Sequence, residues 1–93
     1  MLSLDTTLET ASAVTRQSLG AESVILSLDS GYLYTANPTT EAFLAALDGR
    51  RTLRQVAALL AEQFDVPLER LHQDLLTLAG RLLEEQLVVS VEP

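Results

Sequence analysis

Apolar and polar residues alternate along the first third of the chain and then recur at helical spacing. Residues 23–29 (SVILSLD) alternate most clearly, with Val24, Leu26 and Leu28 on one side and polar residues on the other. Ile25 interrupts that alternation. The segment predicts a β-strand with its valine and two leucines on one face.

Shorter segments predict a strand on each side of this one. Residues 13–18 (AVTRQS) precede it across a turn predicted at 20–22, and residues 32–36 (YLYTA) follow it. Asp29-Ser30-Gly31 supplies the second turn, because glycine adopts positive φ angles without steric cost. Three strands joined in this way predict an antiparallel sheet. Residues 1–10 predict only a loose lead-in.

The register of the third strand has two alternatives. A three-residue loop would place Tyr32 and Tyr34 on the same face as Leu26, whereas a two-residue loop would place Leu33 and Thr35 there. The tyrosines also have a plain structural interpretation, because tyrosine favours strands and often covers a core edge with its hydroxyl in water. The sequence leaves both registers open.

The rest of the chain predicts three helices and a short final strand. Asn37 can cap free N–H groups and Pro38 suits a first helical position. Thr52 and Gln55 form a capping box for the second helix, and Pro67 precedes the third. The predicted helices cover residues 38–47, 53–64 and 68–85, and the predicted strand covers residues 87–91.

This order of elements predicts an α+β fold that is winged-helix-like, with a three-stranded antiparallel sheet followed by three helices. The length of 93 residues suits one domain over residues 1–93. The chain has no cysteine and one histidine, His72, which excludes a disulfide framework and a multi-histidine metal site. We therefore expect no cofactor.

Charge and hydropathy narrow the partners further. The net charge of −7 argues against nucleic acid and anionic membranes. No apolar run is long enough to cross a bilayer, and the start MLSLDTTLETAS lacks the pattern of a signal peptide. These features predict a cytoplasmic protein.

The third predicted helix is apolar over a wide arc. On a helical wheel the arc covers roughly 160°, whereas a stripe that faces a core needs about 100° or a little more. One edge carries Leu71, Leu78 and Leu82, and the middle and the other edge carry Leu68, Leu75, Ala79, His72, Leu76 and Leu83. Either all of these leucines belong to the core, or one edge stays uncovered and suits an extended peptide that adds to the neighbouring sheet.

Three other classes of function fit less well. A winged-helix DNA-binding protein would need a basic and polar recognition helix, but Arg70 and Arg81 of the third helix are outnumbered by acidic residues. An acyl-carrier protein would need a serine at a helix start, whereas Ser30 lies in a predicted turn. An enzyme would need a carboxylate pair, a metal-ligand set or a nucleophile with its base, and none stands out.

Three segments, in their order and spacing, resemble the PqqD-like family, the stand-alone form of the recognition element for ribosomally synthesised and post-translationally modified peptides (RiPPs). The segments are SGYLYTANPTTEAF, LDGRRTLRQVAALLAEQF and a leucine-rich last helix that contains Asp74. The family usually ends its aromatic strand with Leu-Asn. Asn37 matches this pattern, whereas Ala36 stands at the position of the leucine. The resemblance covers about residues 13–89.

The resemblance implies a non-catalytic domain that holds the leader region of a precursor peptide as an added strand. The peptide would lie beside the third strand and against the third helix. Carried onto this chain, the expected contacts are Tyr32, Leu33, Tyr34, Thr35, His72, Leu76, Ala79 and Leu83. The wheel leaves open which edge of the helix faces the peptide.

Within the family, the NPT helix start and the segment FDVPLERLHQDL resemble the lasso-peptide type more than the pyrroloquinoline-quinone type. The lasso type implies a separate leader peptidase of the cysteine-protease class as the partner. The alternative implies a radical-SAM enzyme, and a winged-helix DNA-binding regulator is a more remote alternative.

Overall fold

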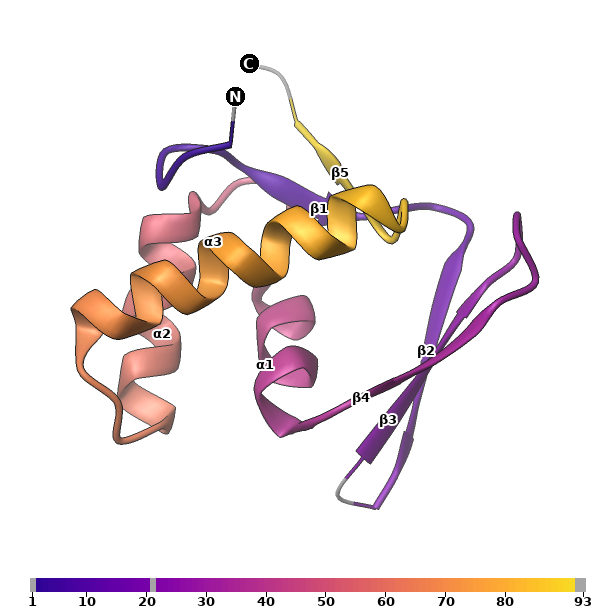
Figure 1. The fold of residues 1–93 in the computed structure, drawn as a ribbon, viewed down its shortest axis with the longest axis horizontal. Helices are drawn as coiled ribbons and strands as arrows, with labels where there is room; N and C mark the ends of the chain where they lie inside the picture. Colours follow the sequence, from indigo (N-terminus) through magenta and orange to yellow (C-terminus); the bar gives the residue numbers. More distant parts are fainter. Residues whose placement is uncertain (1, 21, 92–93) are drawn as a thin grey trace.

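Two small antiparallel sheets and three helices make up the chain in the computed structural model, which describes residues 2–20 and 22–91. The larger sheet lies to one side of the helices, and α3 runs from beside α2 to the smaller sheet (Figure 1). The elements are β1 (Leu8–Thr10), β2 (Val14–Leu19), β3 (Glu22–Ser27), β4 (Leu33–Ala36), α1 (Pro38–Ala46), α2 (Leu53–Gln63), α3 (Leu68–Glu84) and β5 (Val88–Ser90). The predicted turn at 20–22 includes Ala21, and the predicted domain includes residues 1, 21 and 92–93, which lie outside the described residues.

The three-stranded sheet is antiparallel with the strand order β2-β3-β4, as the sequence predicts. Leu33 of β4 lies opposite Leu26 of β3, and Thr35 lies opposite Val24. Gly31, in the turn between the two strands, has a φ of +76°, which fits its predicted role. Of the two alternatives, the register is the one in which Leu33 and Thr35 share a face with Leu26.

The helices cover the face of β3 opposite to the one that carries Val24, Leu26 and Leu28. Val24 and Leu26 are half-buried on the outer face of the sheet, and Leu28 is exposed there. The face turned to the helices carries Ser23, Ile25 and Ser27. Alternation shows which residues share a face, but the helices decide which face is covered. Ile25 packs into the same core cluster as Phe43 of α1, so the helices cover the Ile25 side.

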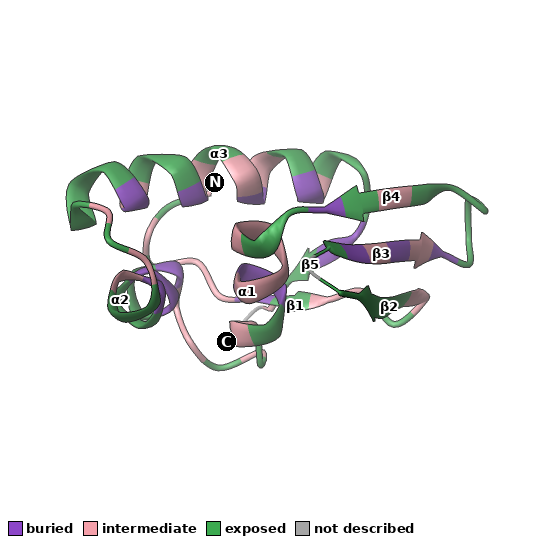
Figure 2. Ribbon diagram, turned by 90° about the horizontal axis from the view of Figure 1, so that it is seen from below, coloured by how far each residue is buried: buried purple, intermediate pink, exposed green. Residues whose placement is uncertain are grey.

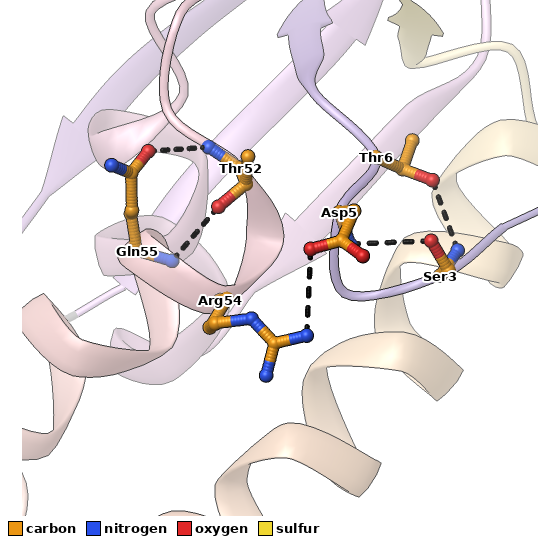
Figure 3. Close-up of polar contacts among 6 residues, drawn as sticks. All are labelled: Ser3, Asp5, Thr6, Thr52, Arg54 and Gln55. Carbon is orange, nitrogen blue, oxygen red and sulfur yellow. Dashed lines mark hydrogen bonds and ion pairs between the residues drawn. The ribbon is translucent and has the colours of Figure 1, made fainter.

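Side-chain hydrogen bonds fix the starts of α1 and α2. Asn37 Oδ1 accepts from the Thr40 N–H at 2.8 Å. Thr52 Oγ1 accepts from the Gln55 N–H at 3.2 Å, and Gln55 Oε1 accepts from the Thr52 N–H at 2.9 Å (Figure 3). Both predicted caps are confirmed, and the predicted bounds of the three helices in the described chain agree with the observed ones within one residue.

The N-terminal segment forms a strand where the sequence predicts a loose lead-in, so that prediction is wrong. β1 pairs with β5, with Leu8 opposite Ser90, and the Leu8 side chain is fully buried. The Leu53 N–H at the start of α2 donates to the Thr6 carbonyl at 2.9 Å. A strand of three residues gives almost no alternation to detect, which explains the miss. The strand predicted over 87–91 is confirmed as β5.

One hydrophobic core joins the helices to the inner face of the larger sheet. The purple segments in Figure 2 lie on the sides of α1, α2 and α3 that face one another and along β3. The largest fully buried aliphatic and aromatic side chains come from six elements and from the residue before β5: Leu8, Ile25, Phe43, Leu44, Leu53, Val56, Leu60, Leu75, Leu87 and Val88.

We expect Thr52→Ala to lower the free energy of unfolding by about 1 kcal/mol, because it removes the hydroxyl of the α2 capping box. For a domain of this size that corresponds to a fall of roughly 4–8 °C in the melting temperature. Thermal and urea denaturation would measure it. Thr77→Ala, at an exposed site inside α3, is the control. Equal stability of the two variants would contradict a stabilising cap.

Candidate peptide-binding groove

A hollow with a volume of about 260 Å³ lies between β4 and the C-terminal half of α3. Figure 2 shows β4 as the strand of the larger sheet nearest to α3. The hollow is lined by Ile25, Tyr34, Thr35, Asn37, Thr40, Leu78, Arg81, Leu82, Glu85 and Leu87, and we call it the groove. Asn37, before α1, and Thr40, in the first turn of α1, are its lining residues from that helix start.

The outer edge of β4 has main-chain groups that no other strand uses in the described chain. In an antiparallel pair, opposite residues alternate between those that exchange hydrogen bonds and those whose N–H and C=O point away from the partner strand. The Ser27 N–H donates to the Tyr32 carbonyl at 3.0 Å, so Tyr34 also belongs to the bonded set. Leu33 and Thr35 therefore direct their N–H and C=O groups to the open edge.

Tyr34 links β4 to the end of α3. Its ring lies on the inner face of the sheet, because Tyr34 is opposite the buried Ile25. Its hydroxyl donates to Glu85 Oε2 at 2.8 Å, and this hydrogen bond is the main cause that raises the pKa of the Tyr34 phenol. The Tyr32 ring packs edge-on against Tyr34, with centroids 6.4 Å apart. Tyr34 thus lines the groove at the β4 side, and Tyr32 packs beside it.

One edge of α3 forms the opposite wall. Leu78 is half-buried and Leu82 is buried, and together they form the apolar floor of the groove. Arg81 and Glu85 are exposed at the rim, and Arg81 forms no ion pair with the described residues. An apolar floor with a charged rim suits a peptide whose alternate side chains point into the groove.

The four helix residues that the resemblance implied as peptide contacts lie outside the groove. Ala79 is fully buried in the core, and Leu76 and Leu83 are half-buried against it. His72 is half-buried, and its Nε2 atom has no hydrogen-bond partner among the described residues. Leu83 lines a second hollow, beside β1 and β5. None of the four lines the groove, so their role as peptide contacts stays a prediction.

The four predicted strand residues take different positions around β4. Tyr34 and Thr35 line the groove, whereas the Tyr32 and Leu33 side chains are each 65% exposed. Leu33 turns its side chain to the outer face while its main chain meets the open edge. Sequence reasoning missed Arg81 and Glu85. The available signal was their helical spacing from Leu78, on the edge that the wheel had also marked as apolar.

The described residues contain no group of three or more histidine, cysteine or acidic residues placed to hold a metal ion. No helix in residues 2–20 and 22–91 has the length and hydropathy needed to span a membrane.

The fold is of the α+β, winged-helix-like class, with a sheet edge beside a helix-lined groove. The chain belongs to the family described as coenzyme PQQ synthesis protein D (PqqD), whose family model matches residues 22–88. This match confirms the resemblance found in the sequence. It spans the chain from the first residue of β3 to the first residue of β5.

A solved structure of TbiB1 in complex with the TbiA(beta) leader peptide has a similar fold. The TM-score is 0.78, and the alignment covers 86% of this chain and 93% of that chain. The sequence identity is 16%, so the likeness supports the fold. A comparison with curated proteins finds no match.

Proposed function

We propose that this protein is a stand-alone RiPP recognition element, which binds the leader region of a precursor peptide by strand addition and catalyses no reaction itself. The open main-chain edge of β4 beside the groove carries this proposal. Strand addition needs an unused row of N–H and C=O groups and pockets for alternate side chains, and both are present here. The leader-bound TbiB1 structure of similar fold supports the same proposal.

The leader would pair with the Leu33 and Thr35 main chain as a fourth strand. Leader residues opposite Tyr34 would point to the inner face, where Leu78 and Leu82 offer an apolar floor. Arg81 and Glu85 would meet polar groups of the leader at the rim. We therefore propose the Leu78–Leu82 edge of α3, with Tyr34 and Thr35, as the leader-binding surface.

We propose that the partner enzyme is a separate leader peptidase of the cysteine-protease class, as in the lasso-peptide type. The second candidate is a radical-SAM enzyme, which the description of the family as a PQQ synthesis protein favours. In both cases we propose a single cytoplasmic domain over residues 1–93 that presents the precursor and needs no cofactor. The neighbouring genes distinguish the two candidates, because one type predicts a protease and a cyclase and the other a radical-SAM enzyme.

Isothermal titration with the leader of the precursor encoded nearest to this gene would test the function. We expect a dissociation constant in roughly the nanomolar-to-micromolar range, as for specific peptide capture. NMR should show shifts at Leu33 and Thr35 and slower amide exchange there, because their N–H groups become hydrogen-bonded. A leader of the same composition in scrambled order is the control. Absence of heat, or shifts confined to other elements, would contradict the proposal.

A further inference from the structure

The outer face of the three-stranded sheet carries several aliphatic residues beside the polar Thr15, Gln17 and Thr35, although no helix of the described chain covers it. Its large aliphatic residues include Leu19, Leu28 and Leu33, whose side chains are 60%, 62% and 65% exposed. Leu26 lies directly opposite Leu33, and Val24 follows on the same face. We call these five residues the outer apolar face.

The central strand of the sheet, β3, places aliphatic and polar residues on the faces opposite to the usual ones. Antiparallel sheets with one solvated face normally turn aliphatic residues inward and polar residues outward. Here two serines are buried, Ser23 at 2% and Ser27 at 5% exposure, while the aliphatic residues of β3 other than Ile25 point outward. Contiguous exposed apolar residues on a small domain are typical of an interaction surface.

We propose that the outer apolar face is the docking surface for the enzyme that processes the leader-bound precursor. This inference rests on the proposed function, because its partner acts on the same peptide. β4 joins the two surfaces: the Leu33 main chain faces the open edge, and the Leu33 side chain belongs to the outer apolar face.

A leader strand on β4 would enlarge this surface. Residues directly opposite each other in a sheet share a face, so leader residues opposite Leu33 and Thr35 would point outward. The enzyme would then contact the protein and the leader together. Its affinity for the leader-bound protein should exceed its affinity for the free protein.

Charge favours a different protein over a second copy of this chain. Glu22 lies on the outer face, opposite Leu19. Arg16 is the one basic residue of β2, β3 and β4 within the described ranges, and it lies on the inner face, 3.1 Å from Glu41. Two copies would bring two outer-face carboxylates and two net charges of −7 together. A partner with an apolar surface bordered by lysine or arginine fits better.

Binding of the purified processing enzyme, encoded in the same gene cluster, would test this inference. The full-length protein is immobilised, and the enzyme is titrated with and without saturating synthetic leader. We expect the double variant Leu26→Gln/Leu28→Gln to weaken enzyme binding at least about tenfold, because it puts polar groups at the centre of the contact. The dissociation constant of the double variant for the leader, measured by calorimetry, should stay within about twofold of the wild-type value.

Two matched variants sharpen the result. Leu19→Gln tests the far end of the same face and should also weaken enzyme binding. Leu59→Gln/Leu68→Gln replaces leucines on α2 and α3 that are 38% and 44% exposed. This control variant should bind the enzyme as the wild type does. Circular dichroism melts establish that all variants are folded.

Each other outcome has a definite meaning. Unchanged enzyme binding by the double variant, or no binding by the leader-loaded wild type, overturns the docking surface. Sedimentation that shows a dimer lost in the double variant, with enzyme binding retained, assigns the face to a second copy and also overturns it. Failure of the wild type to bind leader refutes the proposed function itself, and the calorimetry reports this separately.

Discussion

Thr35→Pro is expected to weaken leader binding at least about tenfold while the domain stays folded. The Thr35 N–H points to the open edge of β4, so proline removes a donor that the β3–β4 pair does not use. Each lost main-chain hydrogen bond costs about 0.5–1.5 kcal/mol, and the proline ring would also obstruct a strand that approaches to about 4.8 Å. Tyr34, which precedes it, already lies in a strand, a conformation that proline tolerates before it.

Two control variants test whether binding depends on the Thr35 N–H or on its side chain, and whether the leader pairs with β4 or with β2. Thr35→Val keeps the N–H and should bind leader almost as wild type does. Ser18→Pro makes the equivalent change on β2, where Ser18 belongs to the set whose N–H points away from β3. Calorimetry with the same leader compares them. Loss of binding in Ser18→Pro, with Thr35→Pro unaffected, would place the leader on β2 instead.

Leu78→Glu is expected to weaken leader binding by about ten- to a hundredfold, because it puts a carboxylate on the apolar floor of the groove. Placing an uncompensated polar group in such a contact costs about 1–3 kcal/mol, and each 1.4 kcal/mol is about tenfold in affinity. The dissociation constant for the leader, measured by calorimetry, checks this.

Leu76→Glu is the matched control for this substitution. Leu76 and Leu78 lie on the same helix and are both half-buried against the core, but only Leu78 lines the groove. The two variants should therefore lose similar stability in thermal melts and differ in leader affinity. If Leu76→Glu weakens binding and Leu78→Glu does not, the leader contacts the edge with His72 and Leu83, as expected from the family resemblance.

Local signals in the sequence predicted most of the elements. Asn37 and Thr52 each satisfy N–H groups within a few residues, so the starts of α1 and α2 can be recognised from the local sequence. Gly31 likewise fixes the turn between β3 and β4 through its own φ. The family resemblance rested on these same junctions, and the match over residues 22–88 confirms it.

The parts that the sequence missed all depend on packing between distant elements. Alternation in β3 could not show that α1 would cover Ile25 and leave Leu26 outside. The apolar arc of α3 contained both edges, and only the path of the chain decided that Leu78 would face β4. The wide arc has two explanations in the structure: Leu76 packs against the core from one edge, and Leu78 lines the groove from the other.

The pairing of β1 with β5 bears on how the domain could be transplanted into another protein. The region matched by the family begins at Glu22, yet Leu8 is fully buried and Thr6 accepts a hydrogen bond from the first residue of α2. A fragment cut to residues 22–88 would lose β1 and β2, expose one side of β3 and leave β5 without its neighbour. A transplanted domain should therefore include the segment from Leu2 onwards, because Leu2 and Leu4 pack against the core ahead of the region that the family model matches.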